Sequence, residues 1–179
     1  MSELRIGNTE RPVPSLLVEE VRTWNTPLVS AYQLWQFTLG YCDAHSEGDA
    51  PLGLLHFIAA PILTSPQLSD TVNQRRKNLQ SYAFGFEDKK RIDVLLDLQS
   101  RIQKRKHHTL ASIDTAICAG LLLWDVDSGK LFPCQPPKAR RGHTLRADLK
   151  REGDKARLLG TWFAEHDLPT IATYLKLVL

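Results

Sequence analysis

The chain has 179 residues with 42% hydrophobic and 24% charged residues and a net charge of +3, which suits one globular domain with a sizeable core and excludes a disordered or collagen-like chain. The longest apolar stretch, residues 52–63, contains a histidine and a proline and is too short to span a bilayer, and the N-terminus has no apolar signal core. Cys42, Cys118 and Cys134 form no CxxC pair, which argues against a disulfide framework or a zinc ribbon and favours a reduced, cytoplasmic setting.

The predicted elements begin with a polar arm and a central helix. Residues 1–14 are expected to be a flexible arm, and Ser15–Arg22 a short first helix. A capping residue followed by proline then starts a helix at Pro27 that runs to Cys42, with apolar residues on more than one face. Ala50-Pro51 is expected to open a second apolar helix, which Pro61 should end or bend.

The middle of the chain is predicted as short segments followed by a long helix. Ser65-Pro66 starts a third segment, and the aromatic stretch 82–87 is expected to be a turn or an extended piece because a glycine interrupts it. Glu87-Asp88 opens the longest predicted helix, since acids favour the first turn and the cations at 104–106 favour the last. Another helix start is predicted after His107-His108.

Residues 121–133 are the clearest β structure. Leu121–Val126 is a short apolar strand, Asp127–Gly129 is a turn, and Lys130–Pro133 is the return strand. A helix, a short helix ending in glycine and then a hairpin follow one another in the order of a winged helix.

A terminal helical pair closes the chain after a basic loop that begins at Pro136-Pro137. The pair starts at about Arg146 and is divided at Asp167–Pro169. We therefore predict a mainly α, winged-helix-like fold with a small β-hairpin, in which residues 15–179 form a single domain.

No pattern of catalytic or metal-binding residues stands out. The histidines show neither HExxH nor HxH spacing, and there is no GxSxG motif, glycine-rich phosphate loop, GKS or GKT. Asp125–Gly129 faintly resembles the start of a calcium loop, but Pro136 stands where a bidentate glutamate belongs, so the hairpin turn is the preferred interpretation. We expect no catalytic residue, no metal site and no cofactor.

Two basic stretches are the polar feature that points to a function. Residues 101–108 hold four cations and no acid, and residues 138–157 hold eight cations and three acids. On one face they would bind a phosphate backbone or an acidic partner, whereas the alternative is a solvated helix face and a loop. The candidate residues for contact with DNA or an acidic partner are Lys138, Arg140, Arg141, Arg146, Lys150, Arg151, Arg105 and Lys106.

Residues 157–179 are strongly apolar, with hydrophobic side chains at helical spacing. Such a terminus must be docked, either on its own domain or on a partner. The candidate protein-contact residues, for which a place in the core is the alternative, are Trp162, Phe163, Tyr174 and Leu175.

Three stretches together resemble a known family. They are WNTPLVSAYQLWQFTLGY at 24–41, PLGLLHFIAAPILTSPQLSDTV at 51–72, and the hairpin GLLLWDVDSGKLFP at 120–133 with the ending RLLGTWFAEHDLPTIATYLKL at 157–177. In this order they are similar to the middle component of three-component ABC-ATPase systems, including the small subunit of Lamassu-type bacterial defence systems. The chain departs from that pattern in its N-terminal arm and in its longer basic loop at 138–150.

The resemblance implies a non-enzymatic accessory subunit without membrane contact. Such a subunit would link an SMC- or Rad50-like ATPase to an effector, often a nuclease, and keep the effector silent until phage or plasmid DNA is sensed. Non-specific contact with double-stranded DNA is an additional expectation from the basic stretches.

Two alternatives stay open. The first is a stand-alone winged-helix DNA-binding regulator, whose recognition helix would be Leu110–Ala119. That segment lacks the arginine, asparagine or glutamine side chains that read bases. The second is a small enzyme whose site is assembled from distant residues.

Overall fold

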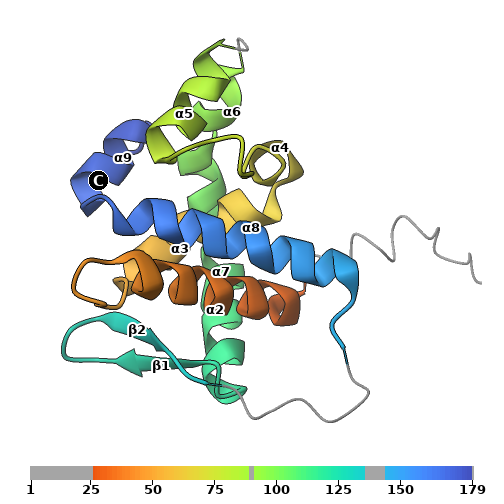
Figure 1. Cartoon of the computed structure of the whole chain (residues 1–179), viewed down its shortest axis with the longest axis vertical. Coiled ribbons are helices and arrows are strands. Elements are labelled where there is room, and N and C mark those ends of the chain that lie inside the picture. The colour runs from red at the N-terminus through yellow and green to blue at the C-terminus, as the bar shows by residue number, and fades with distance from the viewer. Residues whose placement is uncertain (1–25, 89–90, 136–143, 179) are drawn as a thin grey trace, which may run out of the picture.

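The computed structural model describes residues 26–88, 91–135 and 144–178 and shows a helical body with one β-hairpin at its edge (Figure 1). These residues form eight helices and one two-stranded antiparallel sheet, so the predicted mainly α fold with a small β-hairpin is confirmed. The winged-helix likeness stays a prediction. The predicted arm at 1–14, the predicted helix at 15–22 and the loop at 136–143 lie outside the described residues.

In chain order the helices are α2 (Pro27–Ala44), α3 (Gly53–Thr64), α4 (Pro66–Ser69), α5 (Leu79–Asp88), α6 (Ile92–Leu96), α7 (Leu98–Cys118), α8 (Ala147–Ala164) and α9 (Leu168–Tyr174). Strands β1 (Leu122–Asp125) and β2 (Lys130–Pro133) lie between α7 and α8 and pair antiparallel. In their register Leu123 lies opposite Phe132, and Trp124 lies opposite Leu131.

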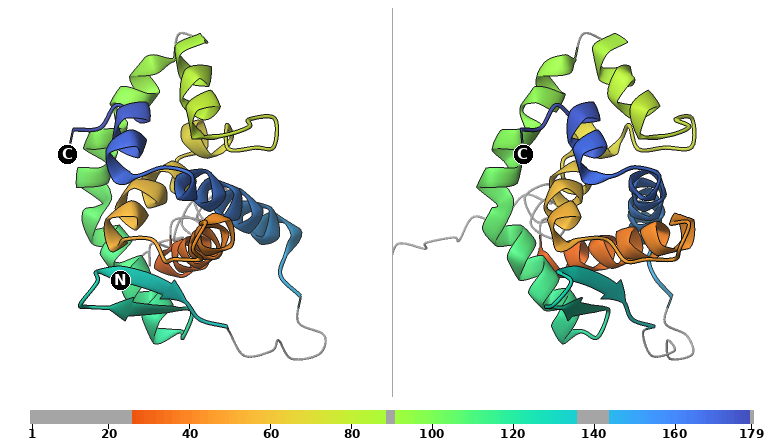
Figure 2. Two further views of the ribbon diagram at one scale, coloured as in Figure 1. Left: turned by 60° about the vertical axis from the view of Figure 1, so that its left-hand side comes forward. Right: turned by 90° about the vertical axis from the view of Figure 1, so that its left-hand side faces the viewer.

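The helices pack around a central pair. Helices α2 and α8 lie side by side, and the long α7 runs across them as a column (Figure 1). Helix α3 lies between α7 and α8, and α5, α6 and α9 gather at the end of the body away from the hairpin (Figure 2). One continuous set of buried apolar side chains draws on all of these elements.

Glycines bring α2 and α8 into close contact. A methyl group at Gly160 of α8 would collide with the carbonyl oxygen of Phe37, and one at Gly40 of α2 would collide with that of Arg157. Beside this contact the rings of Phe37 and Phe163 meet edge to face, with centroids 5.4 Å apart. The absence of two Cβ atoms therefore sets how near the helices lie, and the aromatic pair fills the space beside them.

Three predicted features of the fold are confirmed. Helix α2 covers the predicted residues 27–42, and the hairpin has the predicted strands. The terminal helical pair is divided at Asp167, whose carboxylate accepts a hydrogen bond from the backbone N–H of Thr170 at 3.0 Å. This bond caps α9 at its N-terminus, where a helix leaves backbone donors without partners.

The prediction of a turn or extended piece at 82–87 is wrong, because these residues lie in α5. The side chain of Asn78 accepts a hydrogen bond from the backbone N–H of Ser81 at 2.9 Å and so starts the helix. Tyr82 and Phe86, one turn apart, are both buried and contact each other, with ring centroids 5.2 Å apart. Packing of this aromatic pair outweighs the weak helix propensity of Gly85.

The two helix boundaries predicted between 87 and 112 are also wrong. Glu87-Asp88 ends α5 instead of opening a helix, and the long helix starts only at Leu98. Helix α7 then passes through His107-His108 without a break. Thr109, Ile113 and Ala116 of its second half are buried at helical spacing, so one apolar stripe continues past the histidines.

Pro61 does not end α3, which continues to Thr64. Proline removes one backbone donor and crowds the preceding turn, a cost that tertiary packing can offset. The following residues Ile62 and Leu63 are buried in the core. Their burial keeps the last turn helical.

Candidate functional site

Of the four predicted protein-contact residues, most pack against other residues of this chain. Trp162, Phe163 and Leu175 are fully buried in the core, whereas Tyr174 is half-buried and lies against the ring of His166. For the first three, the structure shows the core alternative. Most of the apolar C-terminal stretch is thus docked on its own chain, whereas Val178 near its end is 81% exposed.

The predicted basic residues do not form one patch in the described structure. Lys138, Arg140 and Arg141 lie outside the described residues. The remaining candidates divide into Arg105 and Lys106 on α7 and, at the start of α8, Arg146, Lys150 and Arg151. Because α3 lies between α7 and α8, the two groups lie on different sides of the body (Figure 2).

Acidic neighbours neutralise much of the positive charge on α8. Arg146 pairs with Asp148 at 3.0 Å, and Arg151 lies 3.9 Å from Glu152. Lys150, in contrast, is exposed and has no ion pair among the described residues. The cation count at 138–157 therefore overstates the charge that this helix offers to an anionic partner.

The basic part of α7 has fewer acidic neighbours. Lys104 and Lys106 are exposed, and neither pairs with an acid among the described residues. Arg101 pairs with Asp97 at 2.8 Å, and burial, followed by the nearby charge of Arg101, lowers the pKa of Arg105. On the described surface, the lysines of α7 are the better candidates for contact with an anion.

The β-hairpin is held firmly against the helical body. The backbone N–H of Leu131 donates to the carbonyl of Pro51 at 3.0 Å, and that of Gly53 donates to the carbonyl of Gly129 at 2.8 Å. Lys130 also forms an ion pair with Asp49, and its hydrogen bond lowers the pKa of that carboxyl. These contacts fix the hairpin relative to α3.

A further contact ties the end of the hairpin to α2. The indole N–H of Trp35 donates to the carbonyl of Cys134 at 3.0 Å. The inward side chains Leu122 and Leu131 are buried in the common core. The hairpin is therefore a rigid part of the surface and not a free arm.

The outer face of the hairpin carries two exposed apolar side chains. Leu123 and Phe132 face each other in the β1–β2 register and are 58% and 37% exposed. Val126, next to the turn, is 84% exposed. Exposed apolar side chains on a fixed support make this face a candidate contact site for another protein. We call Leu123 and Phe132 the hairpin face.

Sequence reasoning missed the hairpin face although a signal was present. Strand residues alternate between two faces, so the run Leu121–Trp124 has to place apolar side chains on both. Among the described residues, Leu122 and Leu131 on one face of this sheet are buried, whereas Leu123 and Phe132 on the other are exposed. Within the part of the chain that the structure describes, no group of three or more His, Cys, Asp or Glu side chains could hold a metal ion.

The comparison with protein families decides where this chain belongs. The pattern of one family, described as ABC-three component (ABC-3C) system Middle Component 3, matches residues 15–178 and hence nearly the whole chain. The chain belongs to the Middle Component 3 family. Comparison with curated proteins gives no match, and comparison with solved structures gives none.

Family membership confirms the coarser part of the expected resemblance. A Middle Component 3 protein is the middle component of an ABC-3C system, as the three stretches at 24–41, at 51–72 and at 120–133 with 157–177 implied. Among the described residues, no helix of this Middle Component 3 protein is long and apolar enough to cross a membrane.

Proposed function

We propose that this chain is a non-enzymatic accessory subunit that links an SMC- or Rad50-like ATPase to an effector, a nuclease, in a bacterial defence complex of the Lamassu type. In the cytoplasm the complex would sense foreign DNA and hold the effector silent until then. Membership of the Middle Component 3 family supports a place beside an ABC component. The remaining details are our proposal.

The hairpin face is the observation that carries this proposal. Leu123 and Phe132 are exposed on a hairpin whose backbone is bonded to Pro51 and Gly53. Apolar side chains on a rigid support lose little entropy when a partner covers them. We assign the ABC component as the occupant of this face, because it is the partner class that the family's description names.

The first test asks which partners the chain has. The tagged chain is purified from its native host, and co-eluting proteins are identified by mass spectrometry. The proposal predicts recovery of a large coiled-coil ATPase in a stable ratio, together with an effector subunit. Recovery of the chain alone, monodisperse and stable, would contradict the proposal.

A second candidate function is contact with double-stranded DNA within the complex. Lys104 and Lys106 on α7, which are exposed and have no ion pair among the described residues, favour it, and Lys150 on α8 is a further candidate. Such contacts to phosphates would be non-specific and would weaken as salt rises. Through these contacts the subunit would bind foreign DNA without recognising its base sequence.

The alternative of a stand-alone regulator has less support. Its proposed recognition helix, Leu110–Ala119, is the second half of α7. One face of this segment is buried, and its exposed side includes Leu110, Ala111 and Asp114. None of these three side chains matches the pattern of base readout in the major groove. A sequence-specific footprint by the isolated chain would revive this alternative.

A further inference from the structure

An apolar groove lies between α3, α7 and the chain segment that follows α9 (Figure 2). Its volume is about 320 Å³, and among the described residues none of its lining side chains is charged. Leu54 of α3 is 50% exposed at this groove, and Val178 is 81% exposed. The half-buried apolar side chains of the walls are Phe57, Ile102, Leu168 and Leu177.

The turn after α9 builds one wall of the groove. Lys176 has a φ of 56°, in the left-handed region that favours glycine at a helix end. The backbone N–H of Leu177 then donates to the carbonyl of Ala172 at 2.8 Å, and that of Val178 donates to Oε1 of Gln99 on α7 at 3.3 Å. Leu177 and Val178 are thus fixed next to α7, which lowers the entropy that a partner loses by ordering this wall.

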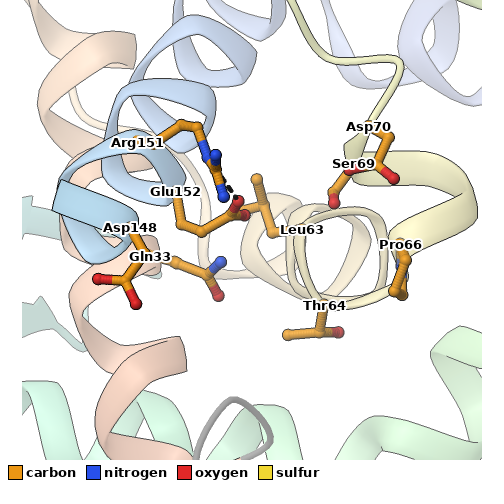
Figure 3. Close-up of a pocket in the computed structure, with 9 residues that line it drawn as sticks. All are labelled: Gln33, Leu63, Thr64, Pro66, Ser69, Asp70, Asp148, Arg151 and Glu152. Atoms are coloured by element: carbon orange, nitrogen blue, oxygen red, sulfur yellow. Dashed lines mark ion pairs between the residues drawn. The ribbon is translucent and has the colours of Figure 1, made fainter. Parts of the chain in front are cut away.

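A second pocket, between α2, α3, α4 and α8, offers less to a partner. Its carboxylates are already paired, since Glu152 lies 2.9 Å from Lys155 and Asp148 lies 3.0 Å from Arg146. Figure 3 shows Arg151 next to Glu152 as well. A ligand there would have to break these pairs, whereas the groove offers uncharged apolar walls.

One cation continues the α7 wall of the groove. Gln99, Ile102 and Gln103 line the groove, and Lys106 follows them on the same face of α7 at helical spacing. Lys106 is exposed and has no ion pair among the described residues. A complementary partner therefore carries an apolar face with an acidic residue beside it.

We propose that the groove binds an amphipathic helix of a partner protein, with its apolar face against Leu54, Ile102 and Val178 and an acidic residue at Lys106. Two walls of the groove are helices, whose backbone groups are bonded within the helices themselves. The occupant must therefore satisfy its own backbone, which a helix does and an extended strand does not. A DNA duplex would leave the apolar walls exposed to water.

This inference does not depend on the proposed function, because the groove shares no residue with the hairpin face. Photo-cross-linking in the native host identifies the occupant. The exposed Leu54 is replaced in the full chain, as Leu54→p-benzoylphenylalanine, and the attached peptide is mapped by mass spectrometry.

The expected product is a segment of another protein with apolar residues at i, i+3 or i+4, and i+7 and with an acidic residue beside them. Three results would overturn the proposal. They are attachment only to this chain's own sequence, as residues 1–25 or as a second copy, attachment to a segment without this pattern, and the absence of any cross-link.

A charge exchange tests the contact at Lys106. A synthetic peptide of the mapped segment is titrated against the full chain and followed by fluorescence anisotropy. Lys106→Glu should weaken binding about tenfold, and a peptide with lysine in place of its acidic residue should bind this variant with the original affinity. An affinity that Lys106→Glu leaves unchanged would overturn the proposal.

The apolar contact has its own variant and control. Leu54→Ser should weaken binding of the same peptide about tenfold. Leu28→Ser is the matched control, because Leu28 is 66% exposed on α2 and does not line the groove. Equal affinity of these two variants, both folded by circular dichroism, would show that the peptide binds elsewhere and would overturn the proposal.

Discussion

At the scale of single residues, His56 is the polar group whose environment has the clearest consequence. Its ring is fully buried beside Phe37, with Nε2 2.8 Å from the hydroxyl of Thr38 and Nδ1 3.3 Å from the carbonyl oxygen of Leu52. The hydroxyl of Thr38 itself donates a hydrogen bond to the carbonyl oxygen of Leu34 at 2.8 Å. Burial, opposed by backbone hydrogen bonds at Leu52 and Gly53, lowers the pKa of His56 to about 4.

This lowered pKa predicts a loss of stability in mild acid. In the unfolded chain the pKa of His56 is 6.5, so between about pH 6.5 and 4 the unfolded state binds a proton that the folded state does not. The stabilising effect of the neutral ring is complete above pH 6.5 and is lost as the pH falls towards 4, by about 3 kcal/mol in total. Urea denaturation at a series of pH values measures this change in the free energy of unfolding.

A non-titrating variant isolates this contribution. His56→Gln keeps a polar partner for Thr38 and should flatten the pH dependence of the unfolding free energy between pH 4 and 6.5. His107→Gln, at an exposed position on α7, serves as the control and should leave the dependence as it is in the native chain. If the unfolding free energy of the His56→Gln variant changed with pH as it does in the native chain, His56 would not be the group responsible for the pH dependence.

At the scale of elements, the contact between α2 and α8 holds the body together. The approach of the helices depends on Gly40 and Gly160, whose missing Cβ atoms leave room for the opposing backbone. A third close approach is made by Gly153, where a Cβ would lie 2.5 Å from the hydroxyl oxygen of Tyr32. Backbone atoms cannot rotate away as a side chain can, so the first two positions tolerate no larger residue without a shift of the helices.

We therefore expect Gly160→Ala to destabilise the fold by about 2 kcal/mol, although alanine is the better helix former. Gly85→Ala on α5 is the matched control, because the atoms nearest to an added methyl group belong to the guanidinium of Arg76, at the far end of a flexible side chain. Its effect should stay within about 1 kcal/mol. Chemical denaturation followed by circular dichroism compares the two. Equal effects of the two substitutions would show that the backbone contact does not limit the packing.

The sequence-based predictions were correct where the structure depends on residues close together in the chain, and wrong where it depends on contacts between distant residues. The hairpin, the start of α2 and the division before α9 depend on turns, prolines and caps such as Asp167, and these were predicted correctly. The helical state of residues 82–87 depends on Tyr82 meeting Trp162, with ring centroids 5.8 Å apart, across a separation of eighty residues in the chain. No local pattern contains that contact, so the glycine was given too much weight.

The candidate sites show the same limit. The apolar character of 157–179 could be seen in the sequence, but whether Trp162 and Phe163 face a partner or the core depends on the glycine-mediated approach of α2. Similarly, the basic residues could be counted from the sequence. The count does not show that Arg146 pairs with Asp148, which reduces the positive charge available to a partner. The outcome for each residue was set by its neighbours in three dimensions.

At the scale of the whole molecule, different sides of the body offer different surfaces. The hairpin face carries apolar side chains, whereas the exposed lysines belong to α7 and the paired charges to the start of α8. This separation would let a subunit contact an ATPase with one surface and nucleic acid with another. It suits a component that works between partners.

The charge distribution predicts which cations affect DNA binding. If α7 contacts phosphates, Lys106→Ala should weaken non-specific binding and make the plot of log affinity against log salt shallower by about 1. Arg157→Ala is the control, since Arg157 already pairs with Asp43 and should change the slope little. Fluorescence anisotropy with a labelled duplex at several salt concentrations measures both slopes. The same slope for Lys106→Ala as for the native chain would exclude this contact.

The most direct measurement is the affinity of the purified chain for the ABC component of the same system, determined by biolayer interferometry. The Leu123→Ser/Phe132→Ser variant should weaken binding at least thirtyfold, which corresponds to about 2 kcal/mol. Phe84→Ser is the matched control, because Phe84 is 51% exposed on α5 at the other end of the body. Binding by the hairpin variant that is as tight as binding by the native chain, with both chains folded, would contradict the account.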